Sequence, residues 1–357
     1  MIGIIMAGGK GTRLLPLTEN KPKPLVSLLG KPVIEYVKDA LVNIGTDEVI
    51  LTTGYMGEGL QQVVDAWNQD SEVLFSVNQE STPMGTAGSV KLLEEKLSDT
   101  FIVASGDSVL SSDLEALVTA HKSSNAKVTM ALWEVDDPTQ YGIVGLSEMQ
   151  NGNVDSRINE GYIVKFQEKP ALSDAFSNVI NAGLYIIEPD VLSYIPEGTK
   201  FDFSKELFPK LLELDMPMYG VKLNGVWFDV GTPQELIRAQ NHLVRNSQTL
   251  PFGLPSGRYL DDDSYVLGNS SSHSQLCRTV VSNNSIIGRD SKLIDTFVMD
   301  GTKVGNNCSV IRTIIGENVK IEDHCELIDC VIGDNVIIEV GTKLHSEKVS
   351  NETINGN

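Results

Sequence analysis

The sequence predicts an α/β domain with a mainly parallel sheet, followed by a parallel β-helix of hexapeptide repeats. Three features predict this fold. Strand and helix patterns alternate over the first part of the chain, a glycine-rich loop follows the first apolar run, and aliphatic residues recur at a fixed period near the C-terminus. At 357 residues the chain is longer than one typical domain, and 41% of its residues are hydrophobic, which is ample for a core.

The first domain is expected to span residues 1–245. Short aliphatic runs predict buried strands, and apolar residues three and four positions apart predict amphipathic helices. We expect strands at 2–6, 48–54, 73–77, 101–105 and 128–135, and helices at 32–44, 59–68, 89–97 and 114–123. Strands at 141–144, 162–170 and 179–186 then extend the sheet over a pocket, and helices at 203–214 and 234–244 follow.

The loop after the first strand is the most informative stretch. It has the sequence AGGKGTRL over residues 7–14, and KPKPL follows over residues 21–25. Three glycines in four positions leave backbone N–H groups bare, so such a loop can wrap a polyphosphate with main-chain donors. Arg13 and Lys23 add two positive charges, and the flanking prolines fix how Lys23 is presented.

The two common glycine loops do not match this one. The P-loop requires Ser or Thr after its Gly-Lys pair, but Lys10 precedes Gly11. The dinucleotide fingerprint requires a third glycine where this chain has Leu14. A plain tight turn would explain the glycines but neither Arg13 nor the KPKP segment.

The string GGKGTRL-x-PLT over residues 8–18, followed by PKPL over residues 22–25, resembles the signature of the sugar-1-phosphate nucleotidyltransferases. The resemblance covers nearly the whole chain and implies a Rossmann-like catalytic domain. It departs at Ser27, where we expect proline, with an effect on loop stiffness only. The resemblance implies catalytic roles for Arg13 and Lys23, and nucleotide binding by Ala7, Gly8, Gly9, Gly11 and Thr12.

Gln79, followed by PMGTAG over residues 83–88, resembles the base-recognition segment of this family. The resemblance implies nucleotide binding by Gln79, Gly85 and Thr86. A Gln side chain offers both a donor and an acceptor to a base edge. Considered alone, a Gln at a strand end is usually solvated, and Gly85 is a turn residue.

Two aspartates at strand ends match the family's metal site. Considered separately, Asp107 would cap a helix and Asp229 would form a turn before Gly231. Beside a triphosphate loop, the pair suits Mg²⁺, which takes few protein carboxylates together with phosphate oxygens. We therefore expect Mg²⁺ as the cofactor, bound by Asp107 and Asp229.

The segment EKP at residues 168–170 resembles the sugar-phosphate motif, in which Glu168 accepts from sugar hydroxyls and Lys169 holds the incoming phosphate. An isolated Glu-Lys pair on a strand is normally exposed surface. Two further pairs, Tyr141 with Gly142 and Asn181 with Gly183, match the segments that line the sugar. Their alternative interpretations are a turn and an ordinary core strand.

These features predict an enzyme of nucleotide-sugar biosynthesis that converts a nucleoside triphosphate and a hexose 1-phosphate into a nucleotide sugar and pyrophosphate. Residues 84–88 and 180–183 most resemble the mannose-1-phosphate guanylyltransferase branch, which implies GTP, mannose 1-phosphate and GDP-mannose. Three alternatives stay open: a glucose-1-phosphate uridylyl- or thymidylyltransferase, an enzyme with an added acetyltransferase activity, and an inactive regulatory subunit.

Near the C-terminus, twelve aliphatic positions form three columns with a period of 17 residues: 281, 298, 315 and 332; 287, 304, 321 and 338; 293, 310, 327 and 344. Steps of six, five and six residues predict a three-sided coil with one inward aliphatic residue on each side. The pattern resembles the left-handed β-helix that many family members carry. We expect it over residues 276–345, after a polar linker at 246–275 and before a disordered tail at 346–357.

The net charge of −20 argues against a nucleic-acid or an anionic-membrane partner. No apolar run approaches the ~20 residues of a membrane span. All four cysteines lie in the last quarter without a zinc-binding spacing, which favours a reducing, cytoplasmic location. We expect a homo-oligomer, assembled through the β-helix.

Overall fold

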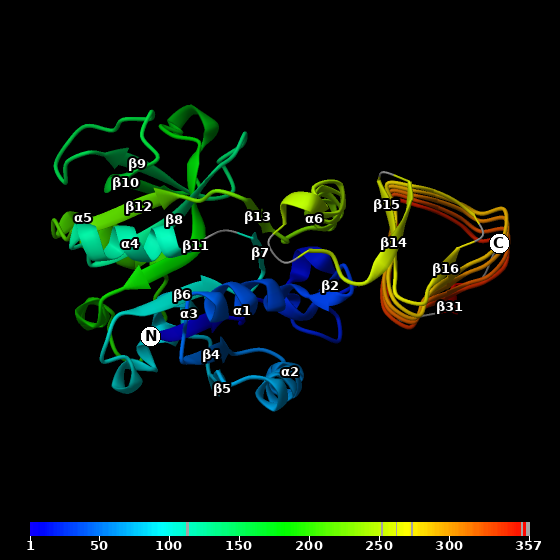
Figure 1. Cartoon of the computed structure of the whole chain (residues 1–357), viewed down its shortest axis with the longest axis horizontal. Helices are drawn as coiled ribbons and strands as arrows, with labels where there is room; N and C mark the ends of the chain where they lie inside the picture. Colours follow the sequence, from blue (N-terminus) through cyan, green and yellow to red (C-terminus); the bar gives the residue numbers. More distant parts are fainter. Residues whose placement is uncertain (112–113, 251–252, 262, 273, 351–352, 355–357) are drawn as a thin grey trace. The chain divides into compact units, whose positions relative to one another are not determined.

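The computed structural model covers residues 1–357 and describes 1–111, 114–250, 253–261, 263–272, 274–350 and 353–354. The chain forms two compact units (Figure 1). The first comprises Met1–Gly8 and Tyr36–Trp227, and the second comprises Gly9–Glu35 and Phe228–Asn357. The glycine loop is therefore divided between the units after Gly8, and most of the signature segment belongs with the C-terminal part of the chain.

The first unit is built on a nine-stranded sheet in the order β5-β4-β1-β6-β11-β8-β12-β10-β9. The pairings run β10 and β11 opposite to the remaining strands, so the predicted, mainly parallel α/β sheet is confirmed. Its strands are β1 (Ile2–Met6), β4 (Glu48–Thr53), β5 (Leu74–Gln79), β6 (Phe101–Ser105), β8 (Val128–Glu134), β9 (Gly142–Ser147), β10 (Glu160–Glu168), β11 (Val179–Ile187) and β12 (Met218–Lys222).

Helices connect these strands. They are α1 (Val33–Asn43), α2 (Gly57–Asp70), α3 (Gly85–Lys91), α4 (Glu115–Ser124) and α5 (Phe208–Glu213). A π-helical turn (Phe203–Leu207) leads into α5, and β7 (Ser108–Ser111) lies outside the large sheet. The predicted helix at 89–97 begins earlier, at Gly85, and ends at Lys91, before a separate 3-10 turn at Glu94–Lys96. The base-recognition segment thus forms the start of α3.

Aromatic rings fill the core beside β11. Tyr185 lies 5.2 Å from Phe203 and 5.0 Å from Phe208, measured between ring centroids. Phe203 and Phe208 themselves stack at 5.6 Å. All three side chains are buried and join the aliphatic core cluster of the sheet. This packing fixes the π-helical turn against the sheet, because large buried aromatic side chains contribute much apolar area.

The C-terminal part of the second unit is a coil of three sheets whose short strands stack in parallel from one coil to the next (Figure 1). The first sheet holds β14 (Gly257–Asp261), β15 (Ser264–Leu267), β18 (Val280–Val281), β21 (Phe297–Val298), β24 (Ile314–Ile315), β27 (Val331–Ile332) and β30 (Lys348–Val349). The second holds β16 (Ser271–Ser272), β19 (Ile286–Ile287), β22 (Lys303–Val304), β25 (Lys320–Ile321), β28 (Ile337–Ile338) and β31 (Thr353–Ile354). The third holds β17 (Gln275–Cys277), β20 (Lys292–Ile294), β23 (Ser309–Ile311), β26 (Glu326–Ile328) and β29 (Lys343–His345).

The register confirms the predicted period of 17 residues. Val281 pairs with Val298, Ile287 with Val304, and Leu293 with Val310, and each column continues in the same way through the stack. The aliphatic side chains of the three columns are buried, apart from Leu344 near the end, which is partly buried. The hexapeptide pattern therefore specified both the coil and its inward-facing residues.

The coil begins earlier than the sequence predicts. Residues 246–275, which we expected to be a linker, hold β14, β15, β16 and the start of β17, and β15 already pairs in parallel with β18. Polar residues hide this first coil in the sequence, because serines occupy buried corner positions. Ser270, for example, is buried and its hydroxyl donates to the carbonyl of Ser282 at 2.5 Å. At the other end, β30 at Lys348–Val349 lies within the predicted disordered tail and pairs with β27.

The second unit also holds helix α6 (Pro233–Arg245) and the small hairpin of β2 (Ser27–Leu28) and β3 (Lys31–Pro32). The boundary between the units falls inside β13 (Val226–Asp229). Among the described residues, no helix is long and apolar enough to cross a membrane.

Two neighbouring residues of β19 provide a matched test of the coil register. Ile287 is fully buried, whereas Ile286 is 47% exposed. We expect Ile287→Asp to lower the melting temperature of the second unit sharply, because an unpaired buried charge costs several kcal/mol, a large share of a domain's stability of about 5–15 kcal/mol. Ile286→Asp should melt like the parent protein. Calorimetry checks this, and equal melting of both variants would show that the inward register is misassigned.

Candidate active site

The first strand delivers the glycine loop to one edge of the parallel sheet. After β1 ends at Met6, the backbone N–H of Ala7 donates to the carbonyl of Thr52 at 2.8 Å, which continues the pairing with β4. Ala7 is buried, and Gly8 lies close enough to Gly54 that an added Cβ would approach the Gly54 nitrogen to 3.6 Å. The predicted nucleotide-binding residues Ala7 and Gly8 thus lie at the carboxyl end of β1, where parallel sheets bind ligands.

Gly11 controls how the second unit folds the rest of the signature. Its φ of +63° lies in the left-handed region, and a Cβ there would come within 2.9 Å of both Lys23 Cβ and Thr18 Cγ2. The Thr18 hydroxyl donates to the Gly11 carbonyl at 2.8 Å. Glycine is therefore required at this position for both conformational and steric reasons. The close approach brings the Lys23 segment against the glycine loop.

Lys23 is paired with one of the two predicted metal ligands. Its Nζ lies 3.2 Å from Asp229 Oδ1, and Lys23 is only 7% exposed. Pro22 precedes a short 3-10 turn at Lys23–Leu25, and the N–H of Val26 donates back to the Lys23 carbonyl at 3.1 Å. The KPKP segment therefore presents Lys23 in a fixed, buried position, as its two prolines predict.

Arg13 belongs to the same group. A Cβ on Gly231 would lie 2.7 Å from Arg13 Nη2 and 3.2 Å from Asp229 Oδ1, so the guanidinium and the carboxylate both lie against Gly231. Arg13 is exposed to solvent. The second unit thus brings together two cations and one carboxylate, from Arg13, Lys23 and Asp229. Such a group, with an excess of positive charge, suits phosphate oxygens.

The alternative interpretations of the two aspartates can now be examined. Helix α6, which follows Asp229, is capped by another residue, because the Thr232 hydroxyl accepts from the backbone N–H of Glu235 at 3.2 Å. Asp107 follows β6 in the first unit and accepts from the Ser105 hydroxyl at 2.5 Å. The element after Asp107 is strand β7, so it does not cap a helix. Asp107 and Asp229 belong to different units, and their pairing around a metal stays a prediction.

The base-recognition segment is tied to the loop before the π-helical turn. Gly85 has a φ of +75°, and a Cβ there would come within 2.6 Å of the Phe201 carbonyl oxygen. The Thr86 hydroxyl donates to Asp202 Oδ2 at 3.0 Å and accepts from the backbone N–H of Phe203 at 2.9 Å. The Thr86 side chain therefore holds the start of α3 in place.

Gln79 is exposed at the end of β5. A Cβ on Gly57 would lie 2.9 Å from its Oε1, so the amide group lies against the first turn of α2. The first unit thus presents the Gln79 amide at the same edge of the sheet at which β1 delivers Ala7.

The predicted sugar-phosphate residues meet where β9 pairs with β10. Glu168 pairs in register with Gly142, and a Cβ on Gly142 would come within 2.8 Å of Glu168 Oε2. Burial raises the pKa of the Glu168 carboxyl, while the charge of Lys169 opposes the shift. Lys169 has a φ of +45°, an uncommon conformation for a side chain of this size, and its N–H donates to the Tyr141 carbonyl at 2.9 Å. Backbone strain of this kind concentrates at functional sites.

Asn181 holds an irregular part of β11. Its Oδ1 accepts from the Gly183 N–H at 2.8 Å, and its Nδ2 donates to the Tyr185 hydroxyl at 2.9 Å. The pairing of β11 with β8 shifts register between Asn181 and Tyr185, and Gly183 takes a φ of +75°. Asn181 thus stabilises the bend beside the predicted sugar site.

Two site residues are missing from the sequence predictions. Trp227 donates its Nε1–H to the Ala182 carbonyl at 2.9 Å and lies edge-on to Tyr141 at 5.9 Å, so it joins two of the predicted sugar-lining segments. Asp202 receives the Thr86 hydroxyl and caps the π-helical turn through the backbone N–H groups of Ser204 and Lys205. A tryptophan two residues before a candidate metal ligand is the signal that could have identified Trp227; no local signal marks Asp202.

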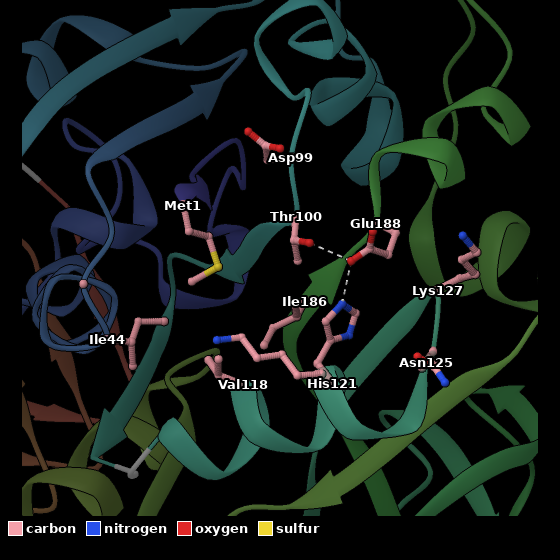
Figure 2. A pocket seen from close by; sticks show the side chains of 13 residues that line it. Met1, Ile44, Asp99, Thr100, Val118, His121, Asn125, Lys127, Ile186 and Glu188 are labelled. Carbon is pink, nitrogen blue, oxygen red and sulfur yellow. Dashed lines mark hydrogen bonds and ion pairs between the residues drawn. The ribbon is translucent and has the colours of Figure 1, made fainter.

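A cavity of about 770 Å³ lies elsewhere, at the amino end of the parallel strands (Figure 2). It is lined by Met1, which precedes β1, and by His121, whose Nε2 lies 3.0 Å from Glu188 Oε1. Thr100 donates to the same oxygen at 2.6 Å, and Nδ1 of His121 lies 2.7 Å from Thr129 Oγ1. Burial would raise the pKa of Glu188, but the hydrogen bonds from Thr100 and His121 lower it overall. None of the predicted site residues lines this cavity.

The comparisons with known proteins agree with the site. The nucleotidyl transferase family model matches residues 2–246, and a GlmU-like C-terminal hexapeptide model matches residues 262–352. The second match includes part of the region that we expected to be a linker. It agrees with the early start of the coil in the structure.

Several characterised proteins are similar over the first two thirds of the chain. A UTP–glucose-1-phosphate uridylyltransferase of Synechocystis is 32% identical over 65% of this chain and 60% of its own length. Mannose-1-phosphate guanylyltransferase 1 of Arabidopsis thaliana is 35% identical over 66% of this chain and 63% of its own length. The mannose-1-phosphate guanyltransferase of Saccharomyces cerevisiae is 34% identical with the same coverage of both chains. The matches thus span about three fifths of these relatives.

A solved structure gives the same picture. The crystal structure of a candidate glucose-1-phosphate thymidylyltransferase from Bacillus anthracis, in complex with a sucrose, superposes with a TM-score of 0.58 at 25% identity. The superposition covers 67% of this chain and 94% of that one. Because the family model spans residues 2–246, more than half of the sequence, the chain belongs to the nucleotidyl transferase family.

Proposed function

We propose that this protein transfers a nucleoside monophosphate from a nucleoside triphosphate to a hexose 1-phosphate and releases pyrophosphate. The observation that carries the proposal is the group formed by Arg13, Lys23 and Asp229 against Gly11 and Gly231. It places two cations on the segment that carries the family signature. The family match and the names of the relatives support the same reaction class.

In the proposed reaction, an oxygen of the sugar phosphate attacks the α-phosphorus of the triphosphate. The bond from the α-phosphorus to the bridging oxygen breaks, and pyrophosphate leaves with that electron pair. The nucleophile is already an anion, so no general base and no covalent enzyme intermediate are needed. Catalysis then depends on positioning and on charge stabilisation, as in other phosphoryl transfers.

The residues take the following proposed roles. Arg13 stabilises the charge that develops on pyrophosphate, and Lys23 holds the α-phosphate. Lys169 orients the attacking phosphate, and Glu168 accepts hydrogen bonds from the sugar hydroxyls. The backbone N–H groups of the glycine loop bind the triphosphate, with Gln79 assigned to the base.

The carboxylates present fit Mg²⁺. Asp107 and Asp229 offer oxygen donors at the ends of strands, and the described part of the chain contains no group of three or more His, Cys, Asp or Glu that would form a closed metal site. Two carboxylates completed by phosphate oxygens are the usual arrangement for this ion. Bound there, Mg²⁺ would neutralise phosphate charge and align the two substrates.

For the substrates, we propose GTP and mannose 1-phosphate. The proposal rests on residues 84–88 and 180–183 and on the guanylyltransferases among the similar proteins. The approach of Gly85 and Gly88 to the backbone near Phe201 keeps small residues at the start of α3, which leaves room for a purine. The uridylyltransferase and the thymidylyltransferase candidate among the similar proteins support glucose 1-phosphate with a pyrimidine nucleotide as the second candidate.

Arg13→Ala should lower kcat by about 10²–10³-fold with little change in melting temperature, because its exposed charge acts on the transition state. Steady-state pyrophosphate release measures this. Arg238→Ala is the matched control, since Arg238 is 68% exposed on α6 and has no proposed role. An Arg13→Ala enzyme as fast as the control would remove Arg13 from the site.

Sugar-phosphate binding should weaken in acid at a higher pH than an ordinary glutamate would cause. Because the pKa of Glu168 is raised above 4.5, its carboxyl becomes protonated sooner as the pH falls and loses its strength as an acceptor. The KM for mannose 1-phosphate should therefore rise on the acid side, and Glu168→Gln should abolish that limb. Glu160→Gln, at an exposed position of the same strand, should keep it. A parental pH profile in Glu168→Gln would contradict the assignment.

Substrate preference can be measured as kcat/KM for GTP, ATP, UTP, dTTP and CTP, first with mannose 1-phosphate and then with glucose 1-phosphate. We expect GTP with mannose 1-phosphate to lead, because a mismatched base leaves buried polar groups unpaired. Discrimination between the sugars should be weaker, as it depends on the orientation of one hydroxyl. A clear lead for UTP or dTTP with glucose 1-phosphate would overturn the guanylyltransferase proposal and leave nucleotidyl transfer intact.

A further inference from the structure

One corner of the β-helix carries a column of polar residues at the same 17-residue period as its core. Asn283, Asp300, Glu317 and Asp334 occupy equivalent places in four successive coils, each two residues after a paired core residue such as Val281. We call these four residues the acidic column. Its members are linked along the stack, since the N–H of Asn283 donates to Asp300 Oδ1 at 3.1 Å and that of Glu317 to Asp334 Oδ1 at 2.9 Å.

Three carboxylates in adjacent coils repel one another, because stacked strands lie only about 4.8 Å apart. The effect is seen at Asp300, whose pKa is raised by burial first and by the charge of Glu317 as well. Lys21 is among the groups that oppose this shift. The acidic column therefore has a need for a cation, and the signature segment supplies one.

Lys21 inserts its ammonium group between two members of the acidic column. Its Nζ lies 2.5 Å from Glu317 Oε1 and 2.8 Å from Asp334 Oδ2, and its side chain is 16% exposed. Burial by itself would lower the pKa of Lys21, but the charges of Asp334 and Glu317 outweigh it and raise the pKa. The ammonium group thus stays charged throughout the neutral range, and the contact is a permanent one.

Lys21 is two residues from Lys23, and Pro22 lies between them. Because proline fixes φ, holding Lys21 also restricts where the next residues can go. Lys23 in turn reaches Asp229 at 3.2 Å. Two fixed ends, one on the β-helix and one on β13, therefore define the path of the segment between them.

Other contacts bring the same coils against the signature segment. A Cβ on Gly333 would lie 3.2 Å from Pro16 Cβ, and a Cβ on Gly30 would lie 2.8 Å from Asn283 Nδ2. Lys348 Nζ lies 3.4 Å from the carbonyl oxygen of Arg13. These contacts and the Lys21 ion pairs all lie within the second unit. The coils therefore support the segment along much of its length.

We propose that Lys21 is a positioning residue, which anchors the signature segment to the acidic column and so sets the positions of Lys23 and Arg13. The β-helix is then part of the catalytic apparatus, although it contributes no group that touches substrate. The proposal rests on the nucleotidyl transfer proposed above for its effect on turnover. A small displacement of positioned groups can cost about 10²-fold in rate.

The test compares Lys21→Met with Lys21→Arg, and with Lys320→Met as the control. Lys320 also pairs with a glutamate of the β-helix, Glu322 at 2.5 Å, but it is 55% exposed and far from the signature segment in sequence. We expect Lys21→Met to lower kcat about 10–100-fold with a smaller change in the KM for GTP. Lys21→Arg should recover most of the loss, and Lys320→Met should behave like the parent protein.

A second background shows whether Lys21 acts through the acidic column. In a Glu317→Gln, Asp334→Asn protein, the further change Lys21→Met should have little additional effect on kcat, because its partners are already gone. An unchanged kcat in Lys21→Met, or a full additional loss in the double-substituted background, would overturn the proposal.

Hydrogen exchange separates this inference from the proposed function. Residues 11–26 should lose backbone protection in Lys21→Met and keep it in Lys21→Arg, whether or not any nucleotide sugar is formed. If the parent protein made no nucleotide sugar from any substrate pair, the proposed function would fail, and the exchange result would still decide the anchor. Equal protection in the parent protein and Lys21→Met would overturn the anchor itself.

Discussion

The buried ion pair between Lys23 and Asp229 is the interaction on which the proposed site depends. It joins the signature segment to the end of β13 at 3.2 Å, and its geometry requires glycine at two positions. Gly11 lets the glycine loop approach Lys23, and Gly231 leaves space for the Arg13 guanidinium beside Asp229. Removing one partner of a buried pair would leave an uncompensated charge, at a cost of about 3–5 kcal/mol. Substitution at any of these positions should therefore disturb stability and chemistry together.

The division of the chain into units gives the β-helix a role beyond a terminal appendage. By sequence, the signature segment directly follows the first strand of the α/β sheet, yet residues Gly9–Glu35 form one compact unit with the coils. Lys21 explains how, because its ion pairs to Glu317 and Asp334 join residues almost three hundred positions apart. A repeat with an inward aliphatic core can carry such an outer column at no cost to its packing, since corner side chains lie outside that core.

Local patterns predicted much of this protein and long-range contacts predicted little of it. The period of 17 residues specified the inward columns through Val281, Ile287 and Leu293 because each coil repeats the same local geometry. The first coil escaped notice because buried serines such as Ser270 replace apolar residues in it. The signature predicted Lys23 beside the glycine loop, but neither the hold of Thr86 on Asp202 nor that of Lys21 on the acidic column leaves a local trace.

The central claim is that the protein positions two phosphates for direct displacement and forms no covalent intermediate. The stereochemical course at the α-phosphorus tests this most directly. A GTP analogue made chiral at that atom by sulfur and an oxygen isotope would be converted with mannose 1-phosphate, and the configuration of the product would be determined by ³¹P NMR. The account predicts inversion, the result of a single in-line step. Retention would require two displacements and an enzyme-bound nucleotide, and would contradict the account.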